Sequence, residues 1–235
     1  MKSVVALIPA KGKSERIKNK NLKKMFNRPL LWWTLDSAKK SKYIDEIYVS
    51  SDSTKILNYS KKQKTKIIKR PKNISNNQAT KKDVIYHALN YLKKKNNFFD
   101  YLIYLQPTSP LRTRHHIDHA LNKILKKKFS GLVSVLRQSD DNLWKIKVKN
   151  NKILNDTRKN KNFVKRSQDL KKIYKPNGAI FIFNLKKLKY KNQFDISKGF
   201  EIYEMDRPSS IDIDDNYDFS LADLILKKRL GKNLL

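Results

Sequence analysis

Two aspartates near the carboxyl end of the chain, Asp212 and Asp214, have the spacing of a paired-carboxylate site. They lie two residues apart in a stretch that reads as extended, so their side chains point to the same side. Two such carboxylates hold Mg²⁺ when phosphate oxygens and waters complete its octahedral shell. The alternative is that one of them caps the helix that follows. Because only 21 residues are acidic and Asp215 adds a third within four positions, the sequence favours a metal site.

A polar, basic turn follows the first apolar segment. Residues 4–8 are typical of a buried strand, which Pro9 and Gly12 bring to an end. The turn carries five cations, a hydroxyl and an amide: Lys11, Lys13, Ser14, Arg16, Lys18, Lys20 and Asn21. Backbone N–H groups and cations beyond the carboxyl end of a strand bind polyphosphate oxygens. A solvated basic loop explains the same composition, and the spacing matches neither the dinucleotide fingerprint nor Walker A.

Amide and hydroxyl side chains follow the most strand-like segment, residues 100–106. Gln106, Thr108 and Ser109 come at its carboxyl end, which in an open α/β sheet is the edge where ligands bind. These groups suit a sugar or a base rather than acid–base chemistry. A plain turn accounts for them equally well.

Two further groups of side chains have structural interpretations. His115, His116 and His119 have no acidic neighbour to support a metal site and lack the HExxH pattern, so a solvated helix start is favoured. Trp32 and Trp33 fall within an apolar helical segment and are expected in the core.

Composition excludes several classes of protein. The 235 residues include no cysteine, which rules out disulfides and thiolate metal sites. No apolar run reaches the roughly 20 residues of a membrane span, and the amino-terminal residues lack a secretory signal, so a cytoplasmic protein without a membrane partner is expected. The net charge of +33 suggests nucleic-acid binding. However, the lysines are spread over the whole chain, and Lys, Asn and Ile share A/T-rich codons, so no specific nucleic-acid partner is expected.

Apolar patterning predicts strands and helices that alternate along the chain. Strands are expected at 4–8, 43–52, 66–69, 100–106, 131–136, 179–183 and 201–205, and helices at 29–38, 53–63, from about 80, at 114–127 and at 216–230. This alternation indicates an α/β fold, a three-layer, mostly parallel twisted sheet. Residues 1–235 are interpreted as one domain. Within it, 137–176 form an insertion or dimerisation arm, with an edge strand over 144–148 followed by an Asn-Asn hairpin turn.

Several motifs, in order and at family-like spacing, resemble the acylneuraminate (CMP-sialic acid) cytidylyltransferases. The family's opening motif, approximately Ile-Pro-Ala-Arg-Gly-Gly-Ser-Lys-Arg-Ile-Pro-x-Lys-Asn, is similar to Ile8-Pro-Ala-Lys-Gly-Lys-Ser-Glu-Arg-Ile-Lys-Asn-Lys-Asn21. The other matching segments are Pro29-Leu30, Val49-Ser-Ser-Asp52, Arg70-Pro71, Leu105-Gln-Pro-Thr-Ser-Pro-Leu-Arg112, Arg166-Ser-Gln-Asp169, Asn177-Gly-Ala-Ile180 and Ile211-Asp-Ile-Asp214. The segment that ends at Arg112 is highly specific, and the resemblance spans nearly the whole chain.

The resemblance implies a Rossmann-like nucleotidyltransferase that uses Mg²⁺ to join CMP from CTP to an acidic nine-carbon α-keto sugar. It also implies a homodimer in which the arm reaches the partner's site. By position, the residues implied to bind CTP are Ala10, Lys11, Ser14, Arg16, Lys20, Asn21, Arg70 and Thr80. Those implied to meet the sugar are Gln106, Thr108 and Ser109, and Arg166 and Gln168 are implied to contact its carboxylate or the partner chain. Lys20, Asp212 and Asp214 are the implied catalytic residues, and the two aspartates the implied metal ligands.

The chain departs from the opening motif at three positions. Lys11 replaces an arginine and loses its planar two-pronged donor, Lys13 replaces a glycine, and Glu15 replaces a lysine. A carboxylate at position 15 is expected to point away from a bound phosphate. Two alternatives remain open: a nucleotidyltransferase for Kdo or another sugar, and a catalytically silent nucleotide- or nucleic-acid-binding protein of the same fold.

Overall fold

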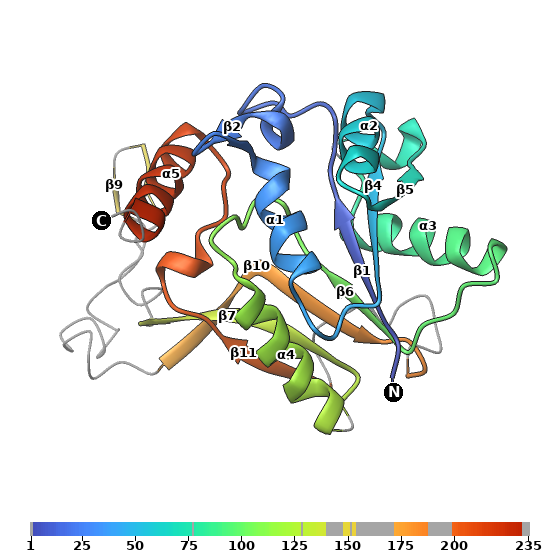
Figure 1. The fold of residues 1–235 in the computed structure, drawn as a ribbon. Helices are drawn as coiled ribbons and strands as arrows, with labels where there is room; N and C mark the ends of the chain where they lie inside the picture. Colours follow the sequence, from blue (N-terminus) through green and yellow to red (C-terminus); the bar gives the residue numbers. More distant parts are fainter. Residues whose placement is uncertain are drawn as a thin grey trace.

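A seven-stranded sheet lies at the centre of the computed structural model, which describes residues 2–76, 78–127, 129–139, 148–150, 152–153, 172–187 and 199–231 (Figure 1). The strands follow the order β11-β7-β10-β6-β1-β4-β5. Their bounds are β1 Val4–Pro9, β4 Glu46–Ser51, β5 Lys66–Lys69, β6 Tyr101–Tyr104, β7 Gly131–Ser139, β10 Lys172–Asn184 and β11 Phe200–Glu204. Every strand of this sheet except β10 points the same way, which confirms the mostly parallel sheet.

β10 differs from the short buried strand expected over 179–183. It is one strand of 13 residues, antiparallel to both β6 and β7, with a bulge between Pro176 and Phe181. Its polar first half pairs with the end of β7, as in the Tyr174–Arg137 pair. The apolar pattern marks only the part of β10 that lies in the core, so the strand begins earlier, at Lys172, than the predicted start at residue 179.

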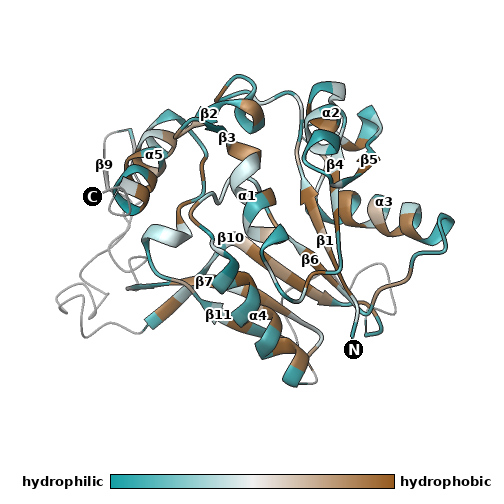
Figure 2. Cartoon of the chain, viewed as in Figure 1, coloured by the Kyte–Doolittle hydropathy of each residue, from teal (hydrophilic) through white to brown (hydrophobic). Residues whose placement is uncertain are grey.

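Alternation of apolar side chains within the strands builds a separate core on each face of the sheet. Val4, Ala6 and Ile8 of β1 face helices α1 (Leu30–Lys39), α2 (Thr54–Lys62) and α4 (Arg114–Lys126). Val5 and Leu7 face α3 (Lys81–Lys94). These two layers of helices around the sheet confirm the three-layer fold, and Figure 2 shows the apolar residues gathered on the strands and on the inner sides of the helices.

A third apolar cluster lies next to the carboxyl edge of the sheet. Here α5 (Asn216–Gly231) packs through Phe219, Ala222 and Leu226 against Ile17 and Leu30. The smaller elements are η1 Lys20–Leu22, β2 Lys24–Met25, β3 Arg28–Pro29, η2 Lys72–Ile74, β8 Val148–Lys149, β9 Lys152–Ile153 and η6 Pro208–Ser210. Packing against α5 holds the first loop and the aspartate segment side by side.

The region expected to be an arm begins as a ribbon that continues out of the sheet. β7 and β10 stay paired as far as Ser139 and Lys172. The expected hairpin is confirmed at β8 and β9, with Asn150 in a left-handed turn conformation. The expected edge strand over 144–147 lies outside the described residues, and the role of 137–176 as a dimerisation arm stays a prediction. Among the described residues, no helix has the length and apolar character needed to cross a bilayer.

Candidate functional site

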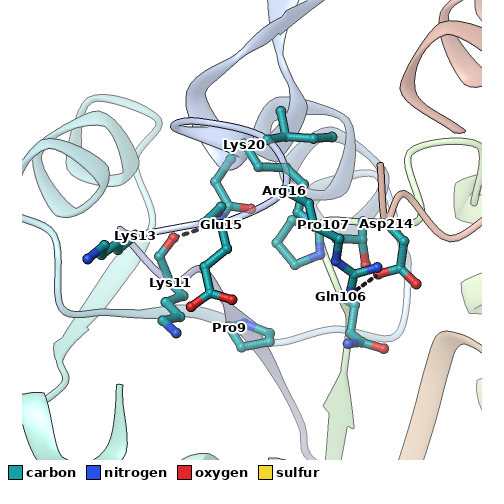
Figure 3. Close-up of a pocket in the computed structure, with 13 residues that line it drawn as sticks. Pro9, Lys11, Lys13, Glu15, Arg16, Lys20, Gln106, Pro107 and Asp214 are labelled. Carbon is teal, nitrogen blue, oxygen red and sulfur yellow. Dashed lines mark hydrogen bonds and ion pairs between the residues drawn. The ribbon is translucent and has the colours of Figure 1, made fainter. Parts of the chain in front are cut away.

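The loops after β1 and β6 line one cavity of about 290 Å³ at the carboxyl edge of the sheet (Figure 3). Because β1 and β6 are parallel neighbours, their carboxyl ends meet at the same edge. The lining residues are Pro9, Lys11, Lys13, Ser14, Glu15, Arg16, Ile17, Lys20, Asn21, Gln106, Pro107, Thr108 and Asp214. The fold therefore brings together the basic turn, the turn after β6 that carries Gln106, Thr108 and Ser109 (the amide–hydroxyl turn), and one aspartate of the pair.

Two hydrogen bonds hold the basic loop in shape. The buried Asn21 donates from Nδ2 to the Lys11 carbonyl at 2.8 Å, and the Gly12 N–H donates to Asp52 Oδ1 at 2.8 Å. A Cβ on Gly12 would lie 2.7 Å from Cβ of Ser53, so this close approach requires glycine. The loop is thus fixed through its backbone, and four of its cations, Lys11, Lys13, Arg16 and Lys20, line the cavity.

Lys20 joins this loop to the aspartate segment. Its Nζ donates to the Ile213 carbonyl at 2.7 Å, and the Ile213 N–H donates to the Thr108 carbonyl at 2.8 Å. Partial burial lowers the pKa of the Lys20 ammonium, while the charges of Asp214 and Asp212 counter part of that shift. All three segments of the site therefore meet around Ile213.

The exposed charges of the loop differ in where they point. Arg16 pairs with Asp214 at 3.2 Å, and both side chains are more than half exposed (67% and 58%), so this ion pair contributes little to stability. Lys13 lies on the far side of the loop from Asp214 (Figure 3). Glu15 lines the cavity close to Lys11 (Figure 3). The loop turns the Glu15 side chain into the cavity, and its orientation relative to a bound phosphate stays a prediction.

Asp215 settles the question of which aspartate caps α5. Its Oδ1 accepts hydrogen bonds from the N–H groups of Tyr217 at 2.8 Å and Asp218 at 3.0 Å. The Asp214 N–H donates to Asp218 Oδ2 at 2.9 Å, but the carboxylates of Asp212 and Asp214 accept no hydrogen bond from the helix start among the described residues. The Ile213 side chain between them is fully buried, whereas both aspartates are exposed. The pair is therefore presented on the outer side of the segment, next to the cavity.

The Asp212 side chain is exposed to solvent on one side, but protein atoms surround much of its carboxyl group. Desolvation raises its pKa, a hydrogen bond from the Thr108 side chain opposes that rise, and the negative charge of Asp214 adds to it. A cation shared by the two carboxylates would relieve both the desolvation and the repulsion. Within the described residues, no cluster of three or more His, Cys, Asp or Glu side chains offers a metal site. The pair fits a hard cation that takes its other ligands from phosphate and water.

A cytidylyltransferase family model matches residues 5–229. The chain belongs to the cytidylyltransferase family. The N-acylneuraminate cytidylyltransferase of Escherichia coli O18:K1:H7 is 30% identical over 96% of this chain and 52% of its own length. The chain therefore spans about half of that relative. The pseudaminic acid cytidylyltransferase of Campylobacter jejuni is 27% identical over 95% of this chain and 96% of its own length.

Solved structures support the cytidylyltransferase fold. A CMP:2-keto-3-deoxy-manno-octonic acid synthetase complexed with CTP has a TM-score of 0.70 at 14% identity and covers 97% of this chain and 99% of its own. A 4-diphosphocytidyl-2C-methyl-D-erythritol synthase from Anaerococcus prevotii has a TM-score of 0.64 at 16% identity, over 96% of this chain and 99% of its own. Both likenesses concern the fold alone.

Several residues that the family resemblance implied lie outside the cavity of this cytidylyltransferase. Ala10 is buried and donates its N–H to the Ser50 carbonyl at 2.9 Å. Thr80 caps α3 in a reciprocal pair with Asp83, to which its hydroxyl donates at 2.7 Å. Ser109 is fully buried, and its hydroxyl has no partner among the described residues. Ala10 and Ser109 are therefore buried next to the site, whereas Thr80 is an exposed helix cap, and its role in binding CTP stays a prediction.

Arg70 is connected to the basic loop through Asp52. Its guanidinium lies 3.9 Å from Asp52 Oδ1, the atom that also accepts the Gly12 N–H, and only 5% of the residue is exposed. Burial lowers the pKa of the guanidinium, and the Asp52 charge counters that shift. Arg166 and Gln168 lie outside the described residues.

Sequence reasoning missed Arg112 as the residue that holds the amide–hydroxyl turn. Its buried guanidinium donates to the carbonyls of Gln106 at 3.0 Å and Ala179 at 2.8 Å, and to Thr34 Oγ1 at 2.7 Å. Burial lowers its pKa to about 9, which leaves it charged at neutral pH. The signal in the sequence was an arginine at the end of an otherwise uncharged, turn-rich segment.

Gly178 was also missed as part of the site. Its φ is +77°, and an added Cβ would lie 2.8 Å from Gln106 Oε1 and 3.2 Å from Asp212 Oδ2. The Asn177-Gly178 dipeptide is typical of left-handed backbone, but only the fold reveals that it touches both polar groups. Of the histidines, His116 completes the cap of α4 with Thr113, which agrees with a helix start.

Both tryptophans of α1 are partly buried rather than fully in the core. Trp33 packs at the edge of the third apolar cluster, and its Nε1 donates to the Met25 carbonyl at 3.3 Å. Trp32 stacks edge-on against Trp33 and lies beneath the Arg28 guanidinium. The expectation that they pack inside the protein is therefore met only in part, because the inner face of α1 is formed by its smaller residues.

Proposed function

We propose that this cytidylyltransferase transfers CMP from CTP to the anomeric hydroxyl of a nine-carbon α-keto acid sugar, with release of pyrophosphate. The relatives described above are named for sialic acid and pseudaminic acid, both acidic nine-carbon sugars. One observation in the structure carries the proposal. A cavity is lined by cations of the basic loop on one side and by Gln106 and Thr108 on the other, and Asp214 of the aspartate pair also lines it.

The chemistry needs no nucleophilic side chain. The anomeric hydroxyl gives up its proton to solvent as its oxygen attacks the α-phosphorus of CTP in line. A new C–O–P linkage forms, and the bond between the α-phosphorus and the oxygen that bridges to the β-phosphate breaks as pyrophosphate leaves. Lys20 and Lys11, which line the cavity, would bind the triphosphate and stabilise the charge that builds on the leaving group. Gln106 and Thr108 would orient the sugar hydroxyls toward the phosphorus.

Asp212 and Asp214 would hold the Mg²⁺ that we propose as the cofactor. When bound, this ion supplies Lewis-acid neutralisation of phosphate oxygens in the transition state. The donor set supports the proposal, because two exposed carboxylates on one side of an extended segment are hard oxygen ligands. Thr108, which hydrogen-bonds to the Asp212 side chain, would keep that carboxylate oriented.

Pyrophosphate release tests the proposal directly. The protein is incubated with CTP and Mg²⁺ and with a panel of nine-carbon keto acids, the eight-carbon Kdo and neutral ketoses. We expect release with at least one nine-carbon acid. Release with Kdo alone would favour the Kdo-type alternative. No release with any sugar, together with intact CTP binding, would favour the silent alternative, and salt-resistant, sequence-selective nucleic-acid binding would support it.

Two further properties accompany this proposal. CTP is a cytoplasmic nucleotide, so we propose that the enzyme acts in the cytoplasm. The homodimer stays a prediction. Size-exclusion chromatography with light scattering tests it, because a dimer has twice the mass of the 27.8 kDa chain.

A further inference from the structure

The bulge of β10 lies at the edge of the sheet that carries the site. β10 runs antiparallel to β6 and begins to pair with it at Phe181, opposite Tyr104. Gly178, three residues earlier, therefore lies beyond the carboxyl end of β6, beside the turn that begins at Gln106. The register of β10 against β7 shifts between Pro176 and Phe181, and bulges of this kind often re-aim side chains next to active sites.

Buried hydrogen bonds fix the shape of this bulge and tie it to the aspartate segment. The Asn177 Oδ1 accepts from the Ser134 hydroxyl at 2.5 Å and from the Ala179 N–H at 3.1 Å. Its Nδ2 donates to Ser210 Oγ at 2.8 Å, two residues before Asp212. Because a satisfied buried polar network is rigid, the bulge and the segment that carries Asp212 keep one relative position.

Gly178 is the residue of the bulge that touches both polar groups of the site. Its φ of +77° is in the left-handed region, and an added Cβ would lie 2.8 Å from Gln106 Oε1 and 3.2 Å from Asp212 Oδ2. Gln106 lines the cavity. Within the described residues, its hydrogen bonds use the backbone carbonyl, and its side-chain amide has none. The close backbone of Gly178 therefore limits where this amide can lie.

We propose that Gly178 is a positioning residue for the reaction. Because it lacks a side chain, Gln106 and Asp212 both lie against β10, and this fixes the position of the acceptor sugar relative to CTP. The inference rests on the proposed function, in which Gln106 orients the sugar and Asp212 would hold the metal ion. A Cβ at this position would displace both groups, and a misplacement of about 1 Å at a reaction centre costs about 100-fold in rate.

Gly199 offers a matched control for the backbone conformation. Its φ is +75°, and an added Cβ would lie 3.0 Å from Ser130 Oγ. It precedes β11, at the amino end of a strand parallel to β7, so it lies at the opposite edge of the sheet from the cavity. Alanine at either glycine forces a residue with a Cβ into left-handed backbone and displaces a side-chain oxygen. Both variants should therefore lose about 2–4 °C in melting temperature.

The test compares Gly178→Ala with Gly199→Ala. With the preferred sugar acid, we expect Gly178→Ala to raise KM for the sugar about 10-fold and to lower kcat about 10-fold. Gly199→Ala should change each less than threefold. The Kd of CTP, measured without metal, should change less than threefold in both variants. The Kd of Mn²⁺ for the enzyme–CTP complex, measured by calorimetry without sugar, should rise about 10-fold in Gly178→Ala and stay unchanged in Gly199→Ala.

A double-mutant cycle tests whether Gly178 acts through Gln106. In the Gln106→Ala background the shorter side chain leaves room for the added Cβ, so Gly178→Ala should raise KM for the sugar less than threefold further. A further 10-fold rise would overturn the inference, because the effect would then arise elsewhere. If Gly178→Ala fails to fold, Gly178→Asn replaces it in every measurement, since asparagine adopts left-handed backbone more readily.

Failure of this inference differs from failure of the proposed function. If wild type turns over a keto acid and Gly178→Ala matches Gly199→Ala in kcat, KM and the Kd of Mn²⁺, only this inference fails. If wild type turns over no sugar, the proposed function fails. The Mn²⁺ titration needs no sugar, and an equal Kd in wild type and Gly178→Ala would then overturn the positioning of Asp212 as well.

Discussion

The two loops that line the cavity are built in opposite ways. The loop after β1 has exposed charged side chains and is held mainly by the Asn21 and Gly12 hydrogen bonds. The loop after β6 is largely buried and is held by the three hydrogen bonds of Arg112. All three departures from the family's opening motif fall in the exposed loop. Substitution of a charged side chain that is screened by solvent costs little stability, whereas a buried polar network tolerates few changes.

Under the proposed function, Asp212→Asn is expected to have the largest effect of any single change, since Asp212 would hold the metal ion between the two loops. Turnover should fall about 1,000-fold, because a charged ligand is lost where phosphate charge develops. The fold should not lose stability. The folded-state pKa of Asp212 is raised, so its stabilising contribution is present only at low pH and is lost as pH rises through that pKa.

At neutral pH the ionised Asp212 therefore costs stability in the metal-free protein, and asparagine removes that cost. Pyrophosphate release and thermal unfolding measure the two effects. Asp215→Asn is the control, because Asn at a helix cap retains the hydrogen bonds. A melting temperature that drops in Asp212→Asn would contradict the electrostatic account.

Arg112→Met tests the buried loop. Removal of its three hydrogen bonds takes the guanidinium donor from the Ala179 carbonyl and the Thr34 hydroxyl and leaves the Gln106 carbonyl only its longer bonds, so we expect a loss of about 3 kcal/mol or more in unfolding free energy. Urea unfolding measures it. Arg114→Met, an exposed arginine at the start of α4, should change stability by less than about 0.5 kcal/mol. An equal change in unfolding free energy in both variants would show that the loop after β6 does not depend on the buried hydrogen bonds of Arg112.

Lys20→Met tests the point where the exposed loop joins the aspartate segment. We expect kcat/KM to fall about 100-fold through lost stabilisation of the leaving group. Stability should fall by about 1 kcal/mol through the lost hydrogen bond to the Ile213 carbonyl. Lys18→Met, an exposed lysine of the same loop, serves as the control in steady-state kinetics and should retain wild-type values.

Lys13→Gly restores the family's residue and is expected to have the smallest effect. Lys13 points away from Asp214 and is exposed (Figure 3). CTP affinity should therefore change less than threefold, and stability by less than about 0.5 kcal/mol. Calorimetric titration with CTP measures the affinity. A tenfold change would show that the charge of the exposed loop is specific after all.

Much of the fold could be predicted because its signals are local. The apolar run of β1 and the 3.6-residue period of α3 each mark an element by the side that it buries. The ligand edge of the sheet followed from the parallel connectivity alone. The polar half of β10 and the inward turn of Glu15 could not be read in this way. Both depend on what a remote segment places beside them.

The sequence by itself determined which residue types gather at the site: cations after β1, Gln106 and Thr108 after β6, and an aspartate pair near α5. Their order and spacing were sufficient to identify the family. Only the tertiary structure decided which members have which task. Asp215 takes the cap and leaves the pair exposed, and Arg112 holds the turn after β6 from its buried side. The physical reason is that burial, hydrogen-bond partners and electrostatic fields depend on distances between segments far apart in the chain, and the type of a residue does not encode them.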